Sequence, residues 1–401
     1  MRKKRDKLST CVITIDPLHR GGVYALVKVM YQALEELGLN PSLYFLSLKD
    51  RFSLRRRGFS NQLMQGRSIG FIPFTEYLQY IPPALVSSEE LKQFEIFIVV
   101  GGFNACALIP LLNRKRFVCW IATMVADEWR ARLSYAPNDL FRSWSLLSNM
   151  ILLPINTALE RYIFSKASYV HSISSYTKQQ IEQKCGKAGN IGILNYPVDT
   201  ELFHPASECG KSTRERYIFA AGRIGDARKN FPFLLRAFAT VLRSCPYLKL
   251  VIATGEIPSN SSDIKKLASK LGIADSVKFL GRLSQKQMAE YHRSAQVFAL
   301  SSKQEGLGIV ILEAMASGVP VVSTCCGGPE AILKKSGAGF LVPQDNEILF
   351  AEKLLQLLEK SELRYQMGQK AIAYVLQNHS MEDFKSTIVK TYQIVYPEYQ
   401  F

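Results

Sequence analysis

Residues 301–329, SSKQEGLGIVILEAMASGVPVVSTCCGGP, constrain the fold of this chain more than any other segment. Glu305 stands directly before a Gly-Leu-Gly break, and a second carboxylate, Glu313, follows eight residues later inside an almost wholly apolar run. The run leaves no polar stripe, which predicts a helix that is buried on nearly all sides. Residues 319–324 then predict a short buried strand, ended by the Gly-Gly-Pro turn at 327–329. Together these elements indicate a site for an anionic, hydroxyl-rich ligand.

Two carboxylates suggest the acid and nucleophile of a glycoside hydrolase, but helix geometry disfavours that reading. Eight residues of continuous helix span about 12 Å, whereas a hydrolase pair needs about 5–5.5 Å for retention or 6.5–9.5 Å for inversion. Eight steps of roughly 100° also turn Glu305 and Glu313 away from a common face. The Gly-Leu-Gly break weakens this geometry without reversing it.

The alternative gives the two acids separate roles. A helix that opens after Glu305 offers free N–H groups and a positive dipole end, which suit a diphosphate. Glu305 could then accept hydrogen bonds from sugar hydroxyls, and Glu313 from the two hydroxyls of a ribose. The alternatives without a ligand are that Glu305 is an ordinary loop acid near Lys303 and that Glu313 is a charge on the solvent edge of the helix. The residues at the expected helix start are Gly306, Leu307, Gly308 and Ile309.

A second cluster, Gly222 and Arg223 followed by Lys229, comes directly after a strand-like run at 217–221. Two cations six residues apart at a helix start would lie over a pyrophosphate, and the guanidinium could bind it bidentately. Surface cations are common, and Arg228 is a neighbouring one, so this pattern is weak alone.

Gly21 and Gly22 end the first strand-like run and open a helix. Glycine allows backbone to approach a ligand closely, although a plain tight turn explains the pair equally well. Their spacing is not that of a nicotinamide-binding fingerprint.

The chain of 401 residues carries 50 Lys and Arg against 34 Asp and Glu, a net charge of +16. That excess fits phosphorylated ligands, an anionic membrane surface or nucleic acid. Basic runs at 2–7 and 49–67 are compatible with solvated segments or a membrane patch, and no nucleic-acid-binding signature accompanies them. The eight cysteines have no C-x-x-C spacing, so a disulfide framework is not expected. Without a signal-peptide core or a bilayer-length apolar run, we expect a cytoplasmic protein, possibly peripheral to a membrane.

Short β-rich runs alternate with longer amphipathic ones, which predicts an α/β protein with parallel sheets and crossover helices. We expect an N-terminal domain at 1–195, a linker at 196–213, a second domain at 214–380, and a helix at 381–401 that returns to the first domain. Two such domains would leave a cleft between the carboxyl ends of their sheets, where open sheets bind ligands. The expected strands are 11–15, 43–48, 94–100, 117–123, 169–173, 217–221, 249–254, 277–280 and 297–300; the expected helices include 23–37, 231–242 and 381–396.

Metal-binding patterns are missing from the sequence. No D-x-D triplet occurs that would hold a metal on a diphosphate, and the five histidines show no metal-ligand spacing. Phosphate charge would have to be met by Arg223, Lys229 and helix dipoles. We therefore expect neither a metal nor a cofactor.

Together these motifs resemble the large retaining glycosyltransferase family 4, over most of the chain. The family has the GT-B fold, two facing Rossmann-like doubly wound parallel-sheet domains with a cleft between them. Its E-x7-E motif resembles Glu305 and Glu313, and its V-D-x-x-x-F-x-P linker resembles residues 198–205. Its remaining motifs resemble the segments Gly222-Arg223…Lys229, Gly21-Gly22…Val27 and, for the backbone that reads the base, Gly281-Arg282-Leu283.

The resemblance implies a retaining, metal-independent hexosyltransferase that uses a UDP- or GDP-sugar. It implies catalytic roles for Glu305, Arg223 and Lys229. The acceptor, a glycan, lipid-linked glycan or small molecule, would bind the N-terminal domain near Gly21, Thr123 and Asp127. Donor contacts would come from Gly22, Gly222, Leu283, Gly306, Leu307, Gly308, Ile309 and Glu313.

One departure concerns the N-terminal domain, where many family members carry a histidine near the reacting carbon. The corresponding stretch here, CWIATMVADEW at 119–129, has none. Thr123 and Asp127 are the candidates for its place, and His19 and His171 are further ones. A sugar-nucleotide epimerase of the same fold, or a non-catalytic nucleotide-sugar-binding descendant, remains an alternative.

Overall fold

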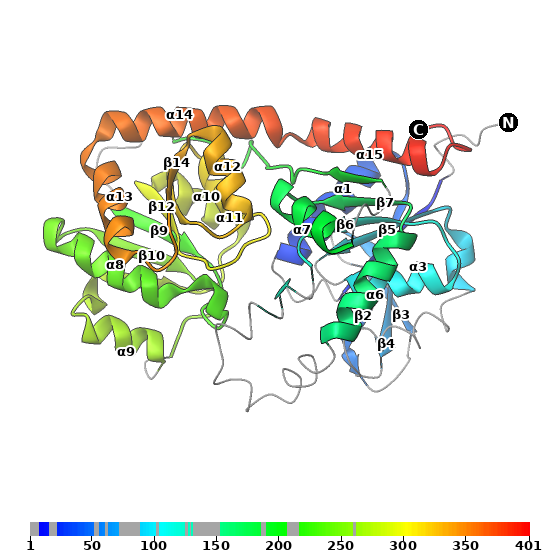
Figure 1. Ribbon diagram of the computed structural model, residues 1–401, viewed down its shortest axis with the longest axis horizontal. Coiled ribbons are helices and arrows are strands. Elements are labelled where there is room, and N and C mark those ends of the chain that lie inside the picture. Colours follow the sequence, from blue (N-terminus) through cyan, green and yellow to red (C-terminus); the bar gives the residue numbers. More distant parts are fainter. Residues whose placement is uncertain are drawn as a thin grey trace. The chain divides into compact units, whose positions relative to one another are not determined.

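The structure, a computed structural model, divides into two compact units (Figure 1), described separately below. Unit 1 comprises residues 1–197 and 381–401, and unit 2 comprises residues 198–380. The sequence-predicted candidates Gly21 and His19 lie outside the described residues, as does the basic run at 2–7. The described residues are 8–15, 22–51, 56–60, 63–71, 89–101, 104–124, 127–128, 130, 153–185, 190–206, 216–259 and 262–401.

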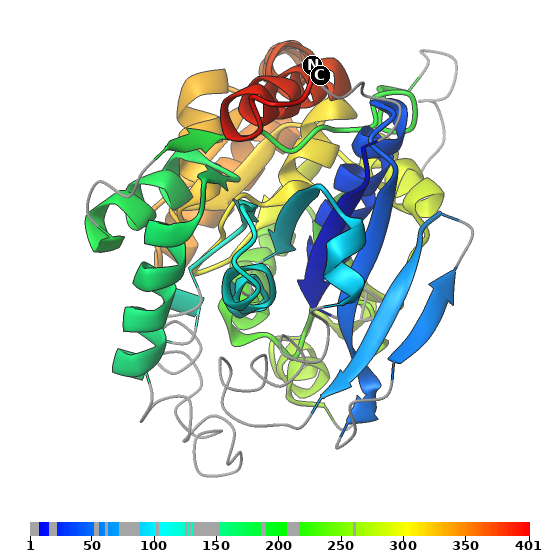
Figure 2. The same cartoon turned by 90° about the vertical axis from the view of Figure 1, so that its right-hand side faces the viewer.

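Unit 1 contains an eight-stranded sheet in the order β3-β4-β2-β1-β5-β6-β7-β8. All neighbours are parallel except β3 and β4, which form an antiparallel edge, drawn in light blue in Figure 2. The strands are β1 Thr10–Ile15, β2 Pro41–Arg51, β3 Arg56–Ser60, β4 Gln65–Phe71, β5 Ile96–Gly101, β6 Val118–Ile121, β7 Tyr169–Ser172 and β8 Ile191–Ile193.

The helices of unit 1 connect and cover these strands. Helix α1 follows β1 and contacts β2, β5 and the C-terminal helix α15. The bounds are α1 Gly22–Glu36, η3 Glu90–Gln93, η4 Asn104–Ala107, α3 Leu108–Leu112, α6 Leu153–Lys166, α7 Ser175–Cys185 and α15 Met381–Val395.

Unit 2 contains a six-stranded, wholly parallel sheet in the order β11-β10-β9-β12-β13-β14. Counted along the unit this is 3-2-1-4-5-6, the doubly wound order whose direction reverses between the first and fourth strands. The strands are β9 Tyr217–Ala221, β10 Lys249–Ala253, β11 Val277–Leu280, β12 Val297–Leu300, β13 Val321–Thr324 and β14 Gly339–Val342. The helices are η7 Ala227–Lys229, α8 Phe231–Ser244, α9 Asp263–Lys270, η8 Ala274–Ser276, α10 Gln285–Ser294, α11 Ile309–Ala316, α12 Gly328–Ser336, α13 Glu347–Glu359 and α14 Ser361–Asn378.

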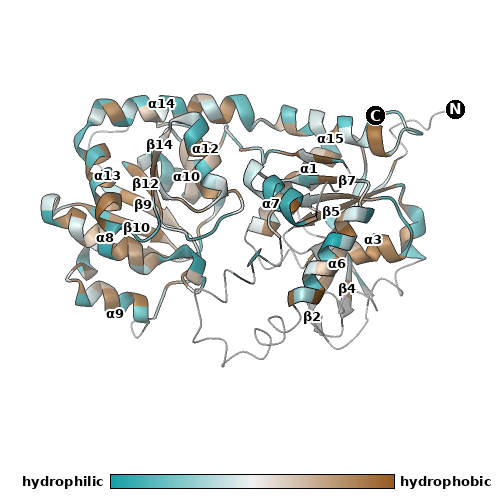
Figure 3. Ribbon diagram, in the orientation of Figure 1, coloured by the Kyte–Doolittle hydropathy of each residue, from teal (hydrophilic) through white to brown (hydrophobic). Residues whose placement is uncertain are grey.

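The central strands of both sheets are hydrophobic, as their brown colour in Figure 3 shows, and most of their described residues are buried. In unit 1 the core includes Phe97, Phe117 and Phe164. In unit 2 the core is built between the sheet, α8 and α13, where the rings of Phe233 and Phe350 meet edge to face at 5.2 Å. Burial of apolar area on this scale is the main stabilising term for each unit.

The predicted parallel α/β pattern is confirmed for every strand and helix named from the sequence, with small shifts at their ends. The strand expected at 319–324 begins at Val321, because Pro320 has no N–H to donate to a neighbouring strand. The prediction that residues 309–316 form a helix buried on nearly all sides was wrong, because Ile309, Val310 and Glu313 of α11 are partly exposed. Part of α11, including Glu313, is therefore accessible to a ligand. The edge formed by β3 and β4 is antiparallel, and the sequence did not predict these two strands.

The last helix, α15, packs against the sheet of unit 1. The ring of Phe384 lies 5.1 Å from that of Trp120 in β6. The hydroxyl of Tyr396 accepts from the N–H of Phe97 at 3.1 Å and donates to the carbonyl of Arg116 at 3.0 Å. These contacts satisfy buried polar groups while they bury aromatic area. Among the described residues no helix has both the length and the apolar character needed to cross a bilayer.

His171 of β7 also contacts α15, and its burial makes unit 1 sensitive to acid. Its side chain is 2% exposed, and its Nε2 lies 2.9 Å from the Thr391 hydroxyl. Burial lowers the pKa of His171 to about 3. The unfolded chain therefore binds a proton below about pH 6.5 that the folded chain does not. The contribution of neutral His171 is complete above that pH and is lost as the pH falls toward 3.

We predict that His171→Gln will flatten this dependence. Between pH 7 and pH 5 the wild type should lose about 2 kcal/mol more stability than the variant, from 1.36 kcal/mol per pKa unit. Urea unfolding followed by tryptophan fluorescence measures this, since Trp120, Trp129 and Trp144 all belong to unit 1. His204→Gln, at an exposed histidine, is the control. Parallel curves for wild type and His171→Gln would contradict the prediction.

Candidate functional site

Glu305 lies in the loop between β12 and α11, and this loop is fixed to the loop that follows β13. Its N–H donates to the carbonyl of Cys326 at 2.7 Å, and its carbonyl accepts from the N–H of Gly328 at 2.9 Å. A Cβ at Gly328 would lie 2.2 Å from the carbonyl oxygen of Gly306, so only glycine permits this approach. The loops after β12 and β13 are therefore held together by hydrogen bonds at the carboxyl edge of the sheet.

The Glu305 carboxylate is paired with Lys229. Its Oε1 lies 2.5 Å from Lys229 Nζ and accepts a hydrogen bond from the Ser302 hydroxyl at 2.8 Å. Both charged side chains are largely buried, at 19% exposure for Lys229 and 13% for Glu305. The Ser301 hydroxyl donates to the Lys229 carbonyl at 2.8 Å, which ties the loop after β12 to the turn after β9. The pair is thus a charge-assisted contact across the switch point of the sheet.

The turn between β9 and α8 carries a second carboxylate, Asp226, which organises two arginines. Arg228, 12% exposed, donates to both oxygens of Asp226 at 2.9 and 2.7 Å. Arg223 lies 3.2 Å from Asp226 Oδ2 and is 66% exposed. Burial alone would raise the pKa of Asp226, but the hydrogen bonds and charge of Arg228, with Lys229 and Arg223, hold that pKa at about 2. Asp226 stays ionised and leaves Arg223 presented to solvent.

Gly222 and the start of α11 complete the backbone of the site. A Cβ at Gly222 would lie 3.2 Å from the side chain of Lys229, so the glycine gives this lysine its room. Gly308 has φ 79° and begins α11, a conformation that suits glycine. The N–H of Ile311 donates to the carbonyl of Gly308 at 2.9 Å, and the dipole of α11 adds positive potential at this end of the helix. Of the remaining residues named there from the sequence, Leu307 is buried and Ile309 is partly exposed.

Glu313 lies on α11 with 15% of its side chain exposed, and His292 of α10 lies behind it. The distance from His292 Nε2 to Glu313 Oε2 is 3.6 Å, slightly longer than a hydrogen bond. His292 is fully buried, and within the described part of the chain neither ring nitrogen has a hydrogen-bond partner. Its ring packs against Phe203, Phe219 and Phe298, with centroids 5.0–6.0 Å away. A buried imidazole without partners requires an explanation.

Leu283 follows the carboxyl end of β11, on the same edge of the sheet. It precedes Ser284, whose side chain and that of Gln287 form a capping box that fixes the start of α10. A Cβ at Gly281 would lie 3.3 Å from the side chain of Ile257. The structure therefore brings the unit 2 candidates to the carboxyl edge of the sheet, with Lys229 paired to Glu305 and Arg223 in the turn that also carries Lys229.

The candidates of unit 1 lie at the carboxyl edge of their own sheet. Gly22 is the first residue of α1, and a Cβ there would meet nothing within 4 Å. Thr123 and Asp127 follow β6. The Asp127 carboxylate is in close contact with Lys184 and lies 3.5 Å from Arg130 Nη1, so it is already engaged by cations. His171 is buried under α15, which removes it as a substitute for the missing histidine.

Four residues of this site were not predicted from the sequence. Asp226, Ser302 and His292 were not named, and Arg228 was set aside as a neighbour of Lys229. The spacing of Asp226 three residues after Arg223 and two before Arg228 is a signal that could have been used. Nothing in the sequence marks His292, because its surroundings come from distant strands. Within the described ranges, no three His, Cys, Asp or Glu side chains gather as metal ligands would.

Comparison with known proteins places parts of the chain near known glycosyltransferases. Residues 207–374 match the family model described as glycosyl transferases group 1. The GDP-mannose-dependent alpha-(1-6)-phosphatidylinositol monomannoside mannosyltransferase of Mycobacterium tuberculosis is 29% identical over 257 residues, which are 60% of this chain and 65% of that protein. The D-inositol 3-phosphate glycosyltransferase of Streptomyces scabiei is 35% identical over 198 residues, 46% of this chain and 44% of that protein. The matched part of the chain thus spans less than two thirds of the length of these relatives.

A solved structure extends the similarity to the whole fold. Sucrose-phosphate synthase from Thermosynechococcus elongatus superposes with a TM-score of 0.76 at 18% identity, over 97% of this chain and 99% of that one. At this identity the likeness concerns the fold alone. The chain has the GT-B fold, with two α/β units built on parallel sheets.

Proposed function

We propose that this chain, whose residues 207–374 match the glycosyl transferases group 1 family model, is a retaining glycosyltransferase. It moves a hexosyl group from a UDP- or GDP-sugar to an acceptor hydroxyl and keeps the anomeric configuration. The observation that carries the proposal is the Lys229–Glu305 pair beside the exposed Arg223 at the switch point of unit 2. The same edge of a doubly wound sheet binds nucleotides in other proteins.

The diphosphate of the donor binds Arg223, Lys229 and the first turn of α11. Arg223 is 66% exposed, and its guanidinium can bind two phosphate oxygens at once. Lys229 is already desolvated beside Glu305 and adds a second charge at short range. These groups meet the phosphate charge without a metal ion in this proposal.

The rest of the donor extends to both sides of the diphosphate. Glu313 accepts hydrogen bonds from the ribose hydroxyls, and the backbone around Leu283 contacts the base. Glu305 accepts hydrogen bonds from the hydroxyls of the sugar. The alternatives without a ligand were an ordinary loop charge at Glu305 and a solvent-edge charge at Glu313. Both are disfavoured because neither side chain is more than 15% exposed. Buried carboxylates persist where they are paired or hydrogen-bonded.

Catalysis is mainly electrostatic. The bond between the sugar C1 and the diphosphate oxygen breaks with its electron pair on the diphosphate, where Arg223 and Lys229 stabilise the growing charge. The acceptor oxygen forms its bond to C1 from the same face, and the departing phosphate oxygen takes its proton. Binding of the substrates excludes water and limits hydrolysis of the donor.

The acceptor binds unit 1 in this proposal. The two relatives described above are named for a phosphatidylinositol mannoside and an inositol 3-phosphate. We extend to this chain the coarser inference that its acceptor is a hydroxyl compound of that general kind, a glycan, lipid-linked glycan or small molecule. With a net charge of +16, the protein is suited to action at the cytoplasmic surface of an anionic membrane.

A thermal-shift screen across UDP-, GDP-, ADP- and TDP-sugars tests the function. The cognate donor should raise the unfolding midpoint by mass action, since it binds only the folded state. That donor, incubated with the protein alone, should give at most slow hydrolysis. A new sugar nucleotide would identify an epimerase, and no stabilisation by any of them would contradict the proposal.

Replacement of the phosphate-binding cations should reduce turnover. We expect Arg223→Ala and Lys229→Ala each to lower kcat by about a hundredfold, the usual loss for a donor that stabilises transition-state charge. Initial rates with the cognate donor measure this. Arg243→Ala, at an exposed arginine of α8, is the control. Full activity of the double variant Arg223→Ala/Lys229→Ala would overturn the assignment.

His292 should support the ribose contact through Glu313. A short movement of Glu313 would let the His292 Nε2–H donate to one carboxylate oxygen and turn the other toward the ribose. We expect His292→Phe to weaken binding of the cognate nucleoside diphosphate about tenfold, the effect of about 1.4 kcal/mol. Binding of the 2′,3′-dideoxy analogue should not change, because it lacks the hydroxyls that Glu313 binds.

Isothermal titration calorimetry of both nucleotides measures the difference. His292→Gln, which keeps a donor, should restore part of the affinity. Equal losses for the nucleotide and its dideoxy analogue would mean that His292 only supports the fold.

A further inference from the structure

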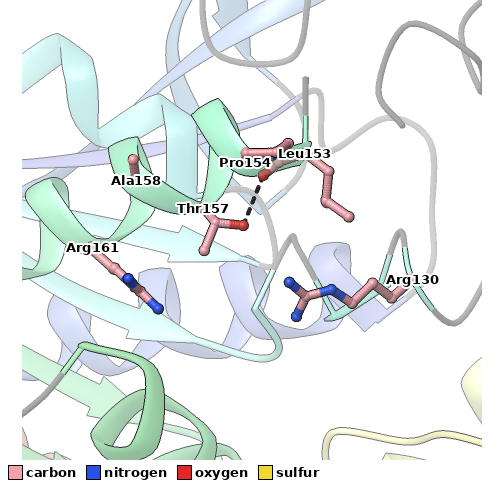
Figure 4. A pocket seen from close by; sticks show the side chains of 6 residues that line it. All are labelled: Arg130, Leu153, Pro154, Thr157, Ala158 and Arg161. Carbon is pink, nitrogen blue, oxygen red and sulfur yellow. Dashed lines mark hydrogen bonds between the residues drawn. The ribbon is translucent and has the colours of Figure 1, made fainter. Parts of the chain in front are cut away.

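A hollow on unit 1 carries two arginines that the donor site does not use. Its volume is about 420 Å³. It is lined by Arg130, Leu153, Pro154, Thr157, Ala158 and Arg161 (Figure 4). The guanidinium groups of Arg130 and Arg161 reach toward the same space from opposite sides, with Thr157 between them (Figure 4).

The charge of this arginine pair is poorly compensated. Arg130 is 53% exposed, and its Nη1 lies 3.5 Å from Asp127 Oδ1. Asp127, however, is in closer contact with Lys184. Within the described segments Arg161 has no ion-pair partner, and the neighbouring Glu160 is fully buried and does not line the hollow. Two guanidinium groups that face the same space create a positive potential that favours an anion between them.

The hollow lies at the carboxyl edge of the unit 1 sheet. Arg130 follows β6 along the chain, and α6 leads into β7, so the first turns of α6 lie at the end where parallel strands finish. Thr123 and Asp127, the acceptor-side candidates, follow the same strand. Open α/β sheets bind their ligands at this edge.

The lining combines two kinds of chemistry. The arginine pair can hold a phosphate bidentately from each side, since the planar guanidinium matches its geometry. Leu153, Pro154 and Ala158 add apolar surface to the lining, against which a carbon skeleton can pack. The volume admits a phosphorylated ring the size of a monosaccharide or cyclitol.

We propose that this arginine pair binds the phosphate group of the acceptor. The inference rests on the proposed function and assigns its acceptor to the phosphate-bearing class. The phosphate belongs to a soluble phosphomonoester or to the phosphodiester of a lipid headgroup. Both present anionic phosphate oxygens to Arg130 and Arg161.

Calorimetry on the full chain with myo-inositol 1-phosphate, with myo-inositol as the uncharged comparison, tests the proposal. The wild type should bind the phosphate ester and not the parent cyclitol. Arg130→Ala and Arg161→Ala should each weaken that binding at least tenfold, and the lysine variants, which keep a point charge, should weaken it less. Arg243→Ala is the matched control. Equal affinity in the double variant Arg130→Ala/Arg161→Ala would overturn the proposal.

Co-sedimentation with vesicles of phosphatidylcholine with and without phosphatidylinositol separates the two sources. Arginine-dependent binding to the phosphatidylinositol vesicles alone would assign the site to a headgroup and still support the proposal. Absence of arginine-dependent binding both to the soluble ester and to vesicles would overturn it.

The affinity of the same samples for the nucleotide shows whether the anion site and the proposed transferase function succeed or fail independently. It should stay unchanged in the arginine variants. Arginine-dependent phosphate binding in a protein that binds no nucleotide sugar would retain the anion site and contradict the transferase.

Discussion

The contact between Lys229 and Glu305 holds together two segments that the chain keeps far apart. Lys229 ends the short helix after β9, and Glu305 lies in the loop after β12. These strands are neighbours only because the sheet reverses its winding between them. The hydroxyls of Ser301 and Ser302 reinforce the same junction from the β12 side. The loop that carries Glu305 also makes the backbone contacts to Cys326 and Gly328 and leads into α11, so the junction connects the turn after β9 with the rest of the site.

Some charged side chains near the junction stabilise the local fold of the site, and others face solvent. Asp226 holds Arg228, which is 12% exposed, and their pairing removes both from competition for a ligand. Arg223 touches the same carboxylate yet remains 66% exposed. Asp226 thus fixes the turn and leaves the exposed guanidinium of Arg223 in the same turn as the largely buried Lys229. A surface ion pair contributes little to stability, so the value of Arg223 to the protein is its availability.

The sequence allowed the framework of unit 2 to be predicted, because its strands and helices are long apolar runs with clear glycine and proline boundaries. It also pointed to Arg223, Lys229, Glu305 and Glu313, whose placement at one edge follows from the strand order. It did not predict β3 and β4, since an arginine-rich, polar edge strand has no apolar alternation to recognise. It did not predict His292 either, whose burial against Phe203 and Phe219 is decided by packing between distant segments. Domain limits and residue roles remain predictions.

The Lys229–Glu305 pair gives a physical reason why the two halves of a nucleotide sugar would bind together. Each charge neutralises the other in a partly buried setting, which avoids the desolvation cost of either alone. Under the proposed function, a diphosphate at Arg223 would compete for Lys229 and weaken its contact with Glu305. The carboxylate would then require new hydrogen-bond donors, which sugar hydroxyls would supply. A nucleoside diphosphate without its sugar would leave that requirement unmet, so the free energies of binding the two halves would be coupled through one lysine.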